Sequence, residues 1–129
     1  MSAPQTTGSP FQLDVDRQPE GTVIHLRGAV TLGFAESFTE VLHAAVSTAT
    51  APIVLELADL TFINSAGLGA LVETHLWCHD KGRVVRVVSP PPAIEQLLAL
   101  THLNELFDVH ASVADALRTD RPTGPSGDA

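Results

Sequence analysis

A serine followed by two closely spaced glycines is the segment of this sequence with most potential for chemistry. It runs from Asn64 to Gly69, directly after an apolar stretch and at the start of a helical pattern. Three roles are open to the Ser65 hydroxyl: a helix cap, a catalytic nucleophile and an acceptor for a phosphoryl group. Serine and asparagine both cap helices, which is worth about 1 kcal/mol relative to alanine, so either Asn64 or Ser65 could simply start the helix.

The sequence around Ser65 does not match the common enzyme motifs. A nucleophile elbow needs glycine two residues before the serine, where this chain has Ile63. None of the six histidines lies in a recognisable charge-relay context. A dinucleotide fingerprint would need glycine or alanine at Val72, and a P-loop would need Gly-Lys-Ser/Thr, which is absent. We therefore expect no catalytic residue, no bound cofactor and no enzymatic activity.

The same segment is well suited to carry a phosphate. A helix N-terminus presents unsatisfied N–H groups and the positive end of the helix dipole. Gly67 and Gly69 leave the first turn without bulk, so a partner could approach Ser65 closely. Each glycine costs a helix up to about 1 kcal/mol relative to alanine, which suggests a function. The alternative is tight packing of the helix on its own sheet, and the residue types leave both explanations open.

Residue periodicity predicts the elements that position this segment. Alternation or continuous apolar runs predict strands, and 3.6-residue spacing predicts helices, one of which opens at Ser65 and stops at Gly82. The predicted strands are 11–16, 22–28, 52–60, 83–89 and 107–110, and the other predicted helices are 34–46, 90–100 and 112–117. The order β-β-α-β-α-β-α-β-α predicts an α/β fold with a mixed β-sheet partly covered by about four helices.

Length and composition predict one soluble domain. The chain has 129 residues, 44% of them hydrophobic, and its small, polar ends predict disordered segments at 1–9 and 118–129 around a folded domain at 10–117. The net charge of −8 argues against nucleic acid and anionic membranes as partners. There is no run long enough to span a bilayer, no secretory signal and only one cysteine, so we expect a cytoplasmic protein.

One further cluster contains possible metal ligands. His75, Cys78 and His79 lie within about one helical turn, with Glu73 nearby. His75, however, falls on the apolar stripe of the predicted helix, and no second ligand pair is evident elsewhere. We expect a partly buried helix face here and no metal site.

The sequence resembles a known family over nearly all of its predicted folded part. The segment from Leu55 to Val72 resembles the signature of STAS domains, the anti-sigma factor antagonist family, in which an apolar strand leads into Asp-Ser-Ser/Thr/Ala-Gly-Leu-Gly. The segment from Leu26 to Leu42 resembles the family's Gly-Glu-Leu-Asp segment and first helix, and Gly82 to Leu117 resembles its C-terminal half. The resemblance extends from about Phe11 to Leu117.

This resemblance implies a protein–protein switch in bacterial transcription regulation. In the family, the unmodified domain binds an anti-sigma factor, often a serine kinase, and so frees a sigma factor. The kinase uses its own ATP to phosphorylate the serine after the motif's acidic residue, and a serine phosphatase reverses the reaction. The matching serine is Ser65. The resemblance implies a partner-binding surface formed by Thr31, Asn64, Ser65, Ala66, Gly67 and Leu68.

The sequence departs from the family pattern where the family has acidic residues. Asn64 replaces the acidic residue before the serine, while Ala29 and Thr31 replace the glutamate and aspartate of Gly-Glu-Leu-Asp. Two functions therefore remain open. One is an antagonist switched by phosphorylation of Ser65. The other is an interaction module that is never phosphorylated: a constitutive antagonist, a scaffold or a transport accessory subunit.

Overall fold

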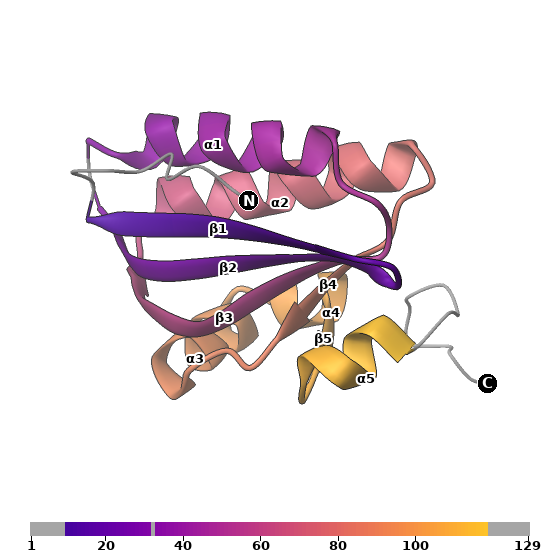
Figure 1. Ribbon diagram of the computed structural model, residues 1–129. Coiled ribbons are helices and arrows are strands. Elements are labelled where there is room, and N and C mark those ends of the chain that lie inside the picture. The colour runs from indigo at the N-terminus through magenta and orange to yellow at the C-terminus, as the bar shows by residue number, and fades with distance from the viewer. Residues whose placement is uncertain (1–9, 32, 119–129) are drawn as a thin grey trace.

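The fold is a five-stranded mixed sheet in a computed structural model that describes residues 10–31 and 33–118. The strands are β1 (Phe11–Gln18), β2 (Gly21–Val30), β3 (Ile53–Ile63), β4 (Val85–Val88) and β5 (Asp108–His110). They lie side by side in chain order, as Figure 1 shows. The β1–β2 hairpin is antiparallel, and the other pairs are parallel.

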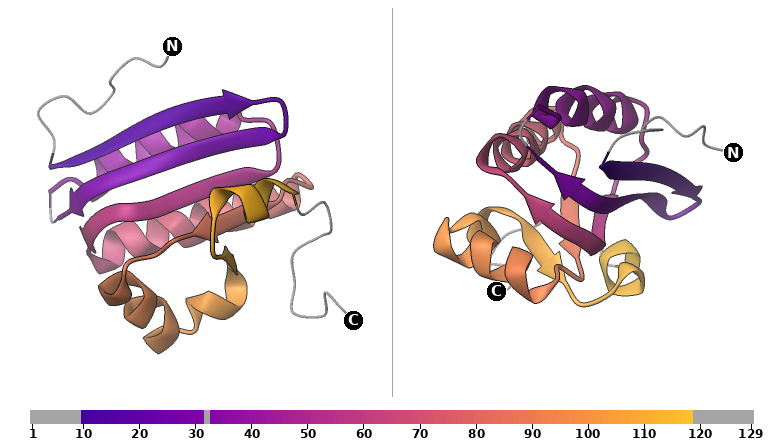
Figure 2. Two further views of the ribbon diagram at one scale, coloured as in Figure 1. Left: turned by 60° about the horizontal axis from the view of Figure 1, so that its bottom comes forward. Right: turned by 90° about the vertical axis from the view of Figure 1, so that its left-hand side faces the viewer.

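Helices cover both faces of this sheet. Those in the described residues are α1 (Ala35–Ser47), α2 (Ser65–Asp80), α3 (Pro92–Leu100), α4 (Leu103–Leu106) and α5 (Val113–Arg118). α1 and α2 lie side by side on one face, and α3, α4 and α5 lie on the opposite side (Figures 1 and 2). The predicted α/β fold with a mixed sheet is therefore confirmed.

Several predicted element boundaries were wrong, and one helix was not predicted. β1 and β2 each continue two residues beyond their predicted ends, to Gln18 and Val30. β3 continues three residues beyond the predicted end at Leu60, because Ile63 pairs with Val30 and the Thr61 hydroxyl donates to the Gly28 carbonyl oxygen at 3.0 Å. β4 is shorter than the predicted strand 83–89. α4 was not predicted, since it is a single turn without a buried residue and leaves no apolar periodicity in the sequence.

The main core lies between the sheet and the α1–α2 layer. Alternate side chains of β1, β2 and β3 point into it, and Phe11 of β1 meets Phe38 of α1 edge to face, with ring centroids 5.4 Å apart. A smaller cluster on the other face joins Val23, Val54 and Val88 to Ala116 of α5. Both faces of the central strands are thus buried over much of their length, which explains their nearly continuous apolar sequence.

The predicted terminal segments fall almost entirely outside the described residues. Residues 1–9 and 119–129 are not among them. Arg118, which was predicted to begin the C-terminal tail, is instead the last residue of α5.

Candidate functional site

Ser65 lies at the edge of the sheet where the parallel strands β2 and β3 end together. Val30 and Ile63 are paired at these ends, and the Asn64 N–H group donates to the Val30 carbonyl oxygen at 3.0 Å. Thr31 follows Val30, so it lies beside the start of α2. The two segments that the family resemblance singles out, far apart in the sequence, therefore meet at one edge.

Asn64, and not Ser65, is the cap of α2. Its backbone is extended, with φ −83° and ψ 177°, and its side-chain oxygen accepts a hydrogen bond from the Gly67 N–H group at 2.8 Å. Its carbonyl oxygen accepts from the Leu68 N–H group at 2.9 Å. A cap needs one acceptor oxygen, which an amide supplies as well as a carboxylate. The replacement of the family's acidic residue by Asn64 therefore keeps the local fold and removes only a negative charge.

Ser65 is the first residue of α2, and its side chain is exposed. Because Asn64 makes the capping hydrogen bond, the Ser65 hydroxyl is not required for it. Ala66 is exposed as well. The start of α2 thus offers a hydroxyl to solvent on a helix N-terminus whose fold does not depend on it.

The two glycines of the motif have opposite surroundings. A methyl group added at Gly67 would lie 2.8 Å from side-chain carbons of both Ile63 and Val30, so α2 can approach the sheet this closely only with glycine there. Gly69 is exposed, and an added methyl would meet nothing within 4 Å. Gly67 serves packing, whereas Gly69 leaves open space beside Ser65.

The residues predicted to bind a partner are accordingly divided between core and surface. Ser65 and Ala66 are exposed, and Thr31 and Asn64 are half-buried. Gly67 is buried, and Leu68, at 7% exposure, belongs to the main core. The surface available to a partner therefore consists of Ser65, Ala66 and Gly69, with parts of Thr31 and Asn64.

One exposed residue at this edge was not singled out in the sequence. Phe62 lies opposite Ala29 near the end of β3 and is 50% exposed. Two register shifts between β2 and β3 each add a residue on β3, which breaks the simple alternation of its side chains. An aromatic side chain three residues before Ser65 was the available signal, but the predicted end of the strand at Leu60 placed it in a loop.

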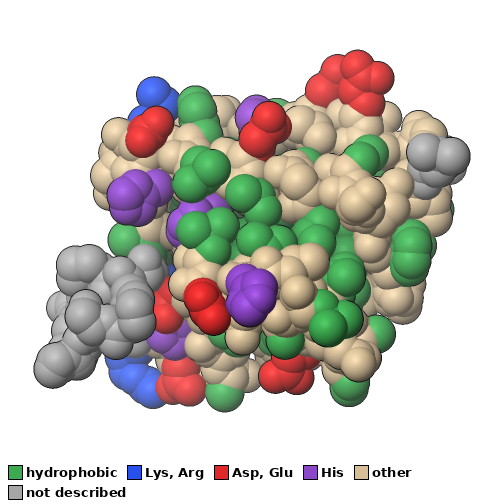
Figure 3. All heavy atoms as spheres, turned by 180° about the vertical axis from the view of Figure 1, so that it is seen from behind, with side chains coloured by type: hydrophobic (Ala, Val, Ile, Leu, Met, Phe, Trp, Pro, Cys, Tyr) green, Lys and Arg blue, Asp and Glu red, His purple; other side chains and the backbone are tan. Residues whose placement is uncertain are grey.

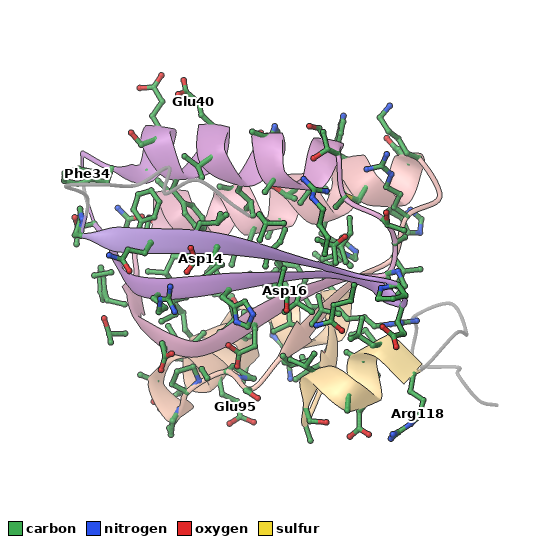
Figure 4. The ribbon with its side chains drawn as sticks, viewed as in Figure 1. Asp14, Asp16, Phe34, Glu40, Glu95 and Arg118 are labelled. Atoms are coloured by element: carbon green, nitrogen blue, oxygen red, sulfur yellow. The ribbon has the colours of Figure 1, made fainter. Side chains whose placement is uncertain are left out.

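The helix α1 begins close to the site, and its exposed charged residues are acidic. Figure 4 shows Phe34 at the start of α1 and Glu40 projecting from its outer side. The Phe34 N–H group donates to the Thr31 carbonyl oxygen at 3.0 Å, which ties the start of α1 to the end of β2. Glu36 and Glu40 are both exposed.

Two of the possible metal ligands, His75 and Cys78, are buried, whereas Glu73 and His79 are exposed. His75 is buried, and its ring meets that of Phe107 edge to face at 5.3 Å. Burial lowers the pKa of the His75 imidazole, and His79 lowers it further. Burial also raises the pKa of the Cys78 thiol, opposed in part by Arg83. Within residues 10–31 and 33–118, no group of three or more His, Cys, Asp or Glu residues is arranged to hold a metal ion.

No helix in the described part of the chain combines the length and the apolar character needed to cross a bilayer.

Comparison with known proteins identifies the family. The STAS domain model matches residues 12–116. The anti-sigma-F factor antagonist RsfA of Mycobacterium tuberculosis is 24% identical over 105 residues, which span 80% of this chain and 82% of that protein.

Solved structures share the fold. The crystal structure of an anti-sigma factor antagonist from Mycobacterium paratuberculosis superimposes with a TM-score of 0.71 at 24% identity, covering 91% of this chain and 96% of that one. The Bacillus cell fate determinant SpoIIAA in its phosphorylated form superimposes with a TM-score of 0.63 at 18% identity, covering 84% and 99%. Since the family model spans most of the chain and the fold agrees, this protein belongs to the STAS domain family.

Proposed function

We propose that this protein is an anti-sigma factor antagonist, a regulatory binding protein that binds an anti-sigma factor through the surface around Ser65 and is switched by phosphorylation of Ser65. The observation that carries the proposal is that different residues cap α2 and expose a hydroxyl at its start. Asn64 caps the helix, which leaves the exposed Ser65 hydroxyl available for modification. The names of the similar proteins, an anti-sigma-F factor antagonist and a phosphorylated SpoIIAA, support it.

Phosphorylation at this position would change the binding surface without unfolding the domain. A phosphate adds about −1.5 to −2 charges at pH 7. The N-terminus of α2 tolerates negative charge because of its free N–H groups and dipole. A partner seated on Ser65, Ala66 and Gly69 would meet this charge and bulk directly. Weakening the complex by about 3 kcal/mol lowers affinity more than a hundredfold.

A partner bound at this surface would be placed to phosphorylate Ser65. An anti-sigma factor with serine kinase activity would bring its own ATP to Ser65, and a serine phosphatase would restore the hydroxyl. Gly69 leaves the space that a kinase active site needs beside the serine. The exposed ring of Phe62 offers apolar area at the same edge.

The first test measures phosphorylation and binding with the same proteins. The chain is incubated with ATP and each anti-sigma kinase of its host, and its intact mass is recorded with Ser65→Ala as control. We expect one phosphoryl group on the wild type and none on Ser65→Ala.

Binding is then compared for Ser65→Asp and Ser47→Asp. Both variants add one negative charge at an exposed serine, but Ser47 ends α1, at the opposite end of that helix from the site (Figure 1). We expect Ser65→Asp to weaken the complex at least about tenfold and Ser47→Asp to leave it nearly unchanged. Equal affinities would remove Ser65 from the interface.

A second function is favoured by the missing acidic residues. Asn64 supplies the cap without a carboxylate, and Thr31 stands where the family has aspartate. A chain that binds its partner but never takes up a phosphoryl group would be a constitutive antagonist, a scaffold or a transport accessory subunit. The Asn64→Asp variant separates the two cases. If it gains a phosphoryl group that the wild type does not, the missing charge is what blocks the kinase.

A further inference from the structure

Large aliphatic side chains are exposed on α2 and α3 and half-buried on α4. Leu76 of α2 is 51% exposed and Leu100 of α3 is 73% exposed. Half-buried aliphatic residues adjoin them along the chain. Together we call them the apolar surface: Val72, Leu76, Leu100, Leu103 and Leu106.

Contacts link the three helices that carry these side chains. Val72 and Leu76 are four residues apart, on the same side of α2. The ring contact between His75 and Phe107, at 5.3 Å, brings the same turn of α2 against the end of α4. α4 in turn follows α3 after a two-residue connection, and the two helices are in contact. In the right panel of Figure 2, α2 lies above α3 at the left of the molecule.

Acidic side chains border the apolar surface. Glu73 and Asp80 flank Leu76 on α2, three residues before and four residues after it, and both are exposed. Glu105 of α4 has a side chain that is 76% exposed. Figure 3 shows hydrophobic side chains gathered across the middle of this face, with acidic side chains above and below them and lysine or arginine only toward the left margin.

We propose that the apolar surface binds a basic amphipathic helix of a second protein. Apolar anchors spaced i, i+3, i+4 and i+7 would cover the leucines, and lysines or arginines beside them would meet the carboxylates of Glu73, Asp80 and Glu105. A second copy of this chain is a poorer occupant, because it would bring carboxylates against carboxylates on a molecule whose net charge is already −8.

The anchors of this surface lie beyond the proposed switch on α2. Leu76 lies eleven residues after Ser65, about 16 Å along the helix axis at 1.5 Å per residue, and Val72, three residues after Gly69, adjoins the switch surface. The inference does not depend on the proposed function, because its anchors Leu76 and Leu100 are not among the residues of the switch. Ser65→Asp should therefore change the affinity for the basic helix much less than Leu76→Gln combined with Leu100→Gln.

The test uses a defined peptide and two neutral substitutions. A helix-forming peptide of roughly 18 residues carries leucine at i, i+3, i+4 and i+7 and lysine beside them. Calorimetry compares its affinity for the wild type, Leu76→Gln, Leu100→Gln and the double variant. Ala44→Gln, on the exposed side of α1, is the matched control. We expect the double variant to lose at least about tenfold in affinity and the control to change less than about twofold.

Three results would overturn the proposal. A scrambled peptide of the same composition could bind equally well, which would reduce the effect to net charge. The double variant could bind like the wild type. Sedimentation equilibrium could show that the wild type pairs with itself through Leu76 and Leu100, which would make a second copy the occupant. Because both leucines are largely exposed, thermal melting of each single variant should confirm an intact fold before binding is compared.

Discussion

At the scale of single residues, neighbouring positions of one motif have different roles, some in the fold and some at the surface. Asn64 caps α2 with its side-chain oxygen, while Ser65 next to it is exposed. Gly67 lets the helix reach the sheet, while Gly69 faces open space. A motif that reads as one functional unit in the sequence is thus divided into residues that build the edge and residues that a partner can touch.

Replacing Gly67 and Gly69 by alanine should change the free energy of unfolding in opposite directions. Gly67→Ala should lower the free energy of unfolding by about 1–3 kcal/mol, because its methyl group would overlap the stiff, β-branched side chains of Ile63 and Val30. Gly69→Ala should raise it by up to about 1 kcal/mol, because alanine is the better helix former and the site is open. Urea unfolding of the matched pair measures both, and changes of the same sign would contradict the assignment.

At the scale of elements, α2 packs on one side and is accessible on the other. Its inner side places Leu71, Thr74 and Cys78 in the interior, and His75 is buried against Phe107. Leu76, on the next position, is half exposed. The helix is apolar on both sides, which a helix that only covers a sheet does not need.

The buried His75 should make stability depend on pH. Its pKa is lowered in the folded protein by burial and by His79, whereas the unfolded chain recovers an ordinary value of about 6.5. Below that pH the unfolded state binds more protons than the folded state. Stability should therefore be fully present above about pH 6.5 and fall as pH drops toward the folded pKa, by at most about 1.4 kcal/mol per pH unit from this one group.

Urea unfolding between pH 7.5 and pH 5.5 measures this dependence in the wild type and in His75→Leu, which replaces the ring with an apolar side chain. The variant should lose less stability on acidification than the wild type. NMR titration of the His75 ring in the folded protein gives a second readout. A midpoint at or above the ordinary histidine pKa would contradict the prediction.

At the scale of the whole molecule, one buried arginine joins the last strands to the last helix. Arg86 of β4 is 1% exposed, and its guanidinium donates to the Ala116 carbonyl oxygen of α5 at 2.6 Å. Its Nε lies 3.5 Å from a carboxylate oxygen of Asp108 on β5, and His110 Nε2 lies 2.7 Å from the same oxygen. These contacts hold α5 over the face of the sheet that α1 and α2 leave uncovered.

Removing this link should loosen α5 more than the rest of the fold. Arg86→Met removes the donor to the Ala116 carbonyl oxygen and one partner of Asp108, which is partly exposed and keeps His110, so the expected loss is that of a buried hydrogen bond to a charged group, about 1–3 kcal/mol. Hydrogen exchange should show lost protection at the amides of α5 while β1–β3 stay protected. A loss under about 1 kcal/mol, with α5 still protected, would show that the small apolar cluster around Ala116 is enough to hold the helix.

Most of the fold could be read from local patterns. Alternation in Phe11, Leu13 and Val15, the apolar run before Ser65 and the helical spacing after it correspond to β1, β3 and α2. Gly82, predicted to stop α2, follows its last residues with φ +75°. These features depend on a few adjacent residues, so the sequence carries them directly. The single turn of α4 and the far end of β3 depend on contacts with other segments, and the prediction missed both.

Local spacing and one contiguous motif were enough to predict the fold class, the order of the elements apart from α4, the family and the place of Ser65 at the start of a helix. Only the packed structure shows which neighbours of Ser65 are buried, that Phe62 is exposed, that Arg86 is enclosed and how the helices that carry the exposed leucines lie relative to one another. Burial is set by the segments that pack against a residue, and those segments lie far from it along the chain.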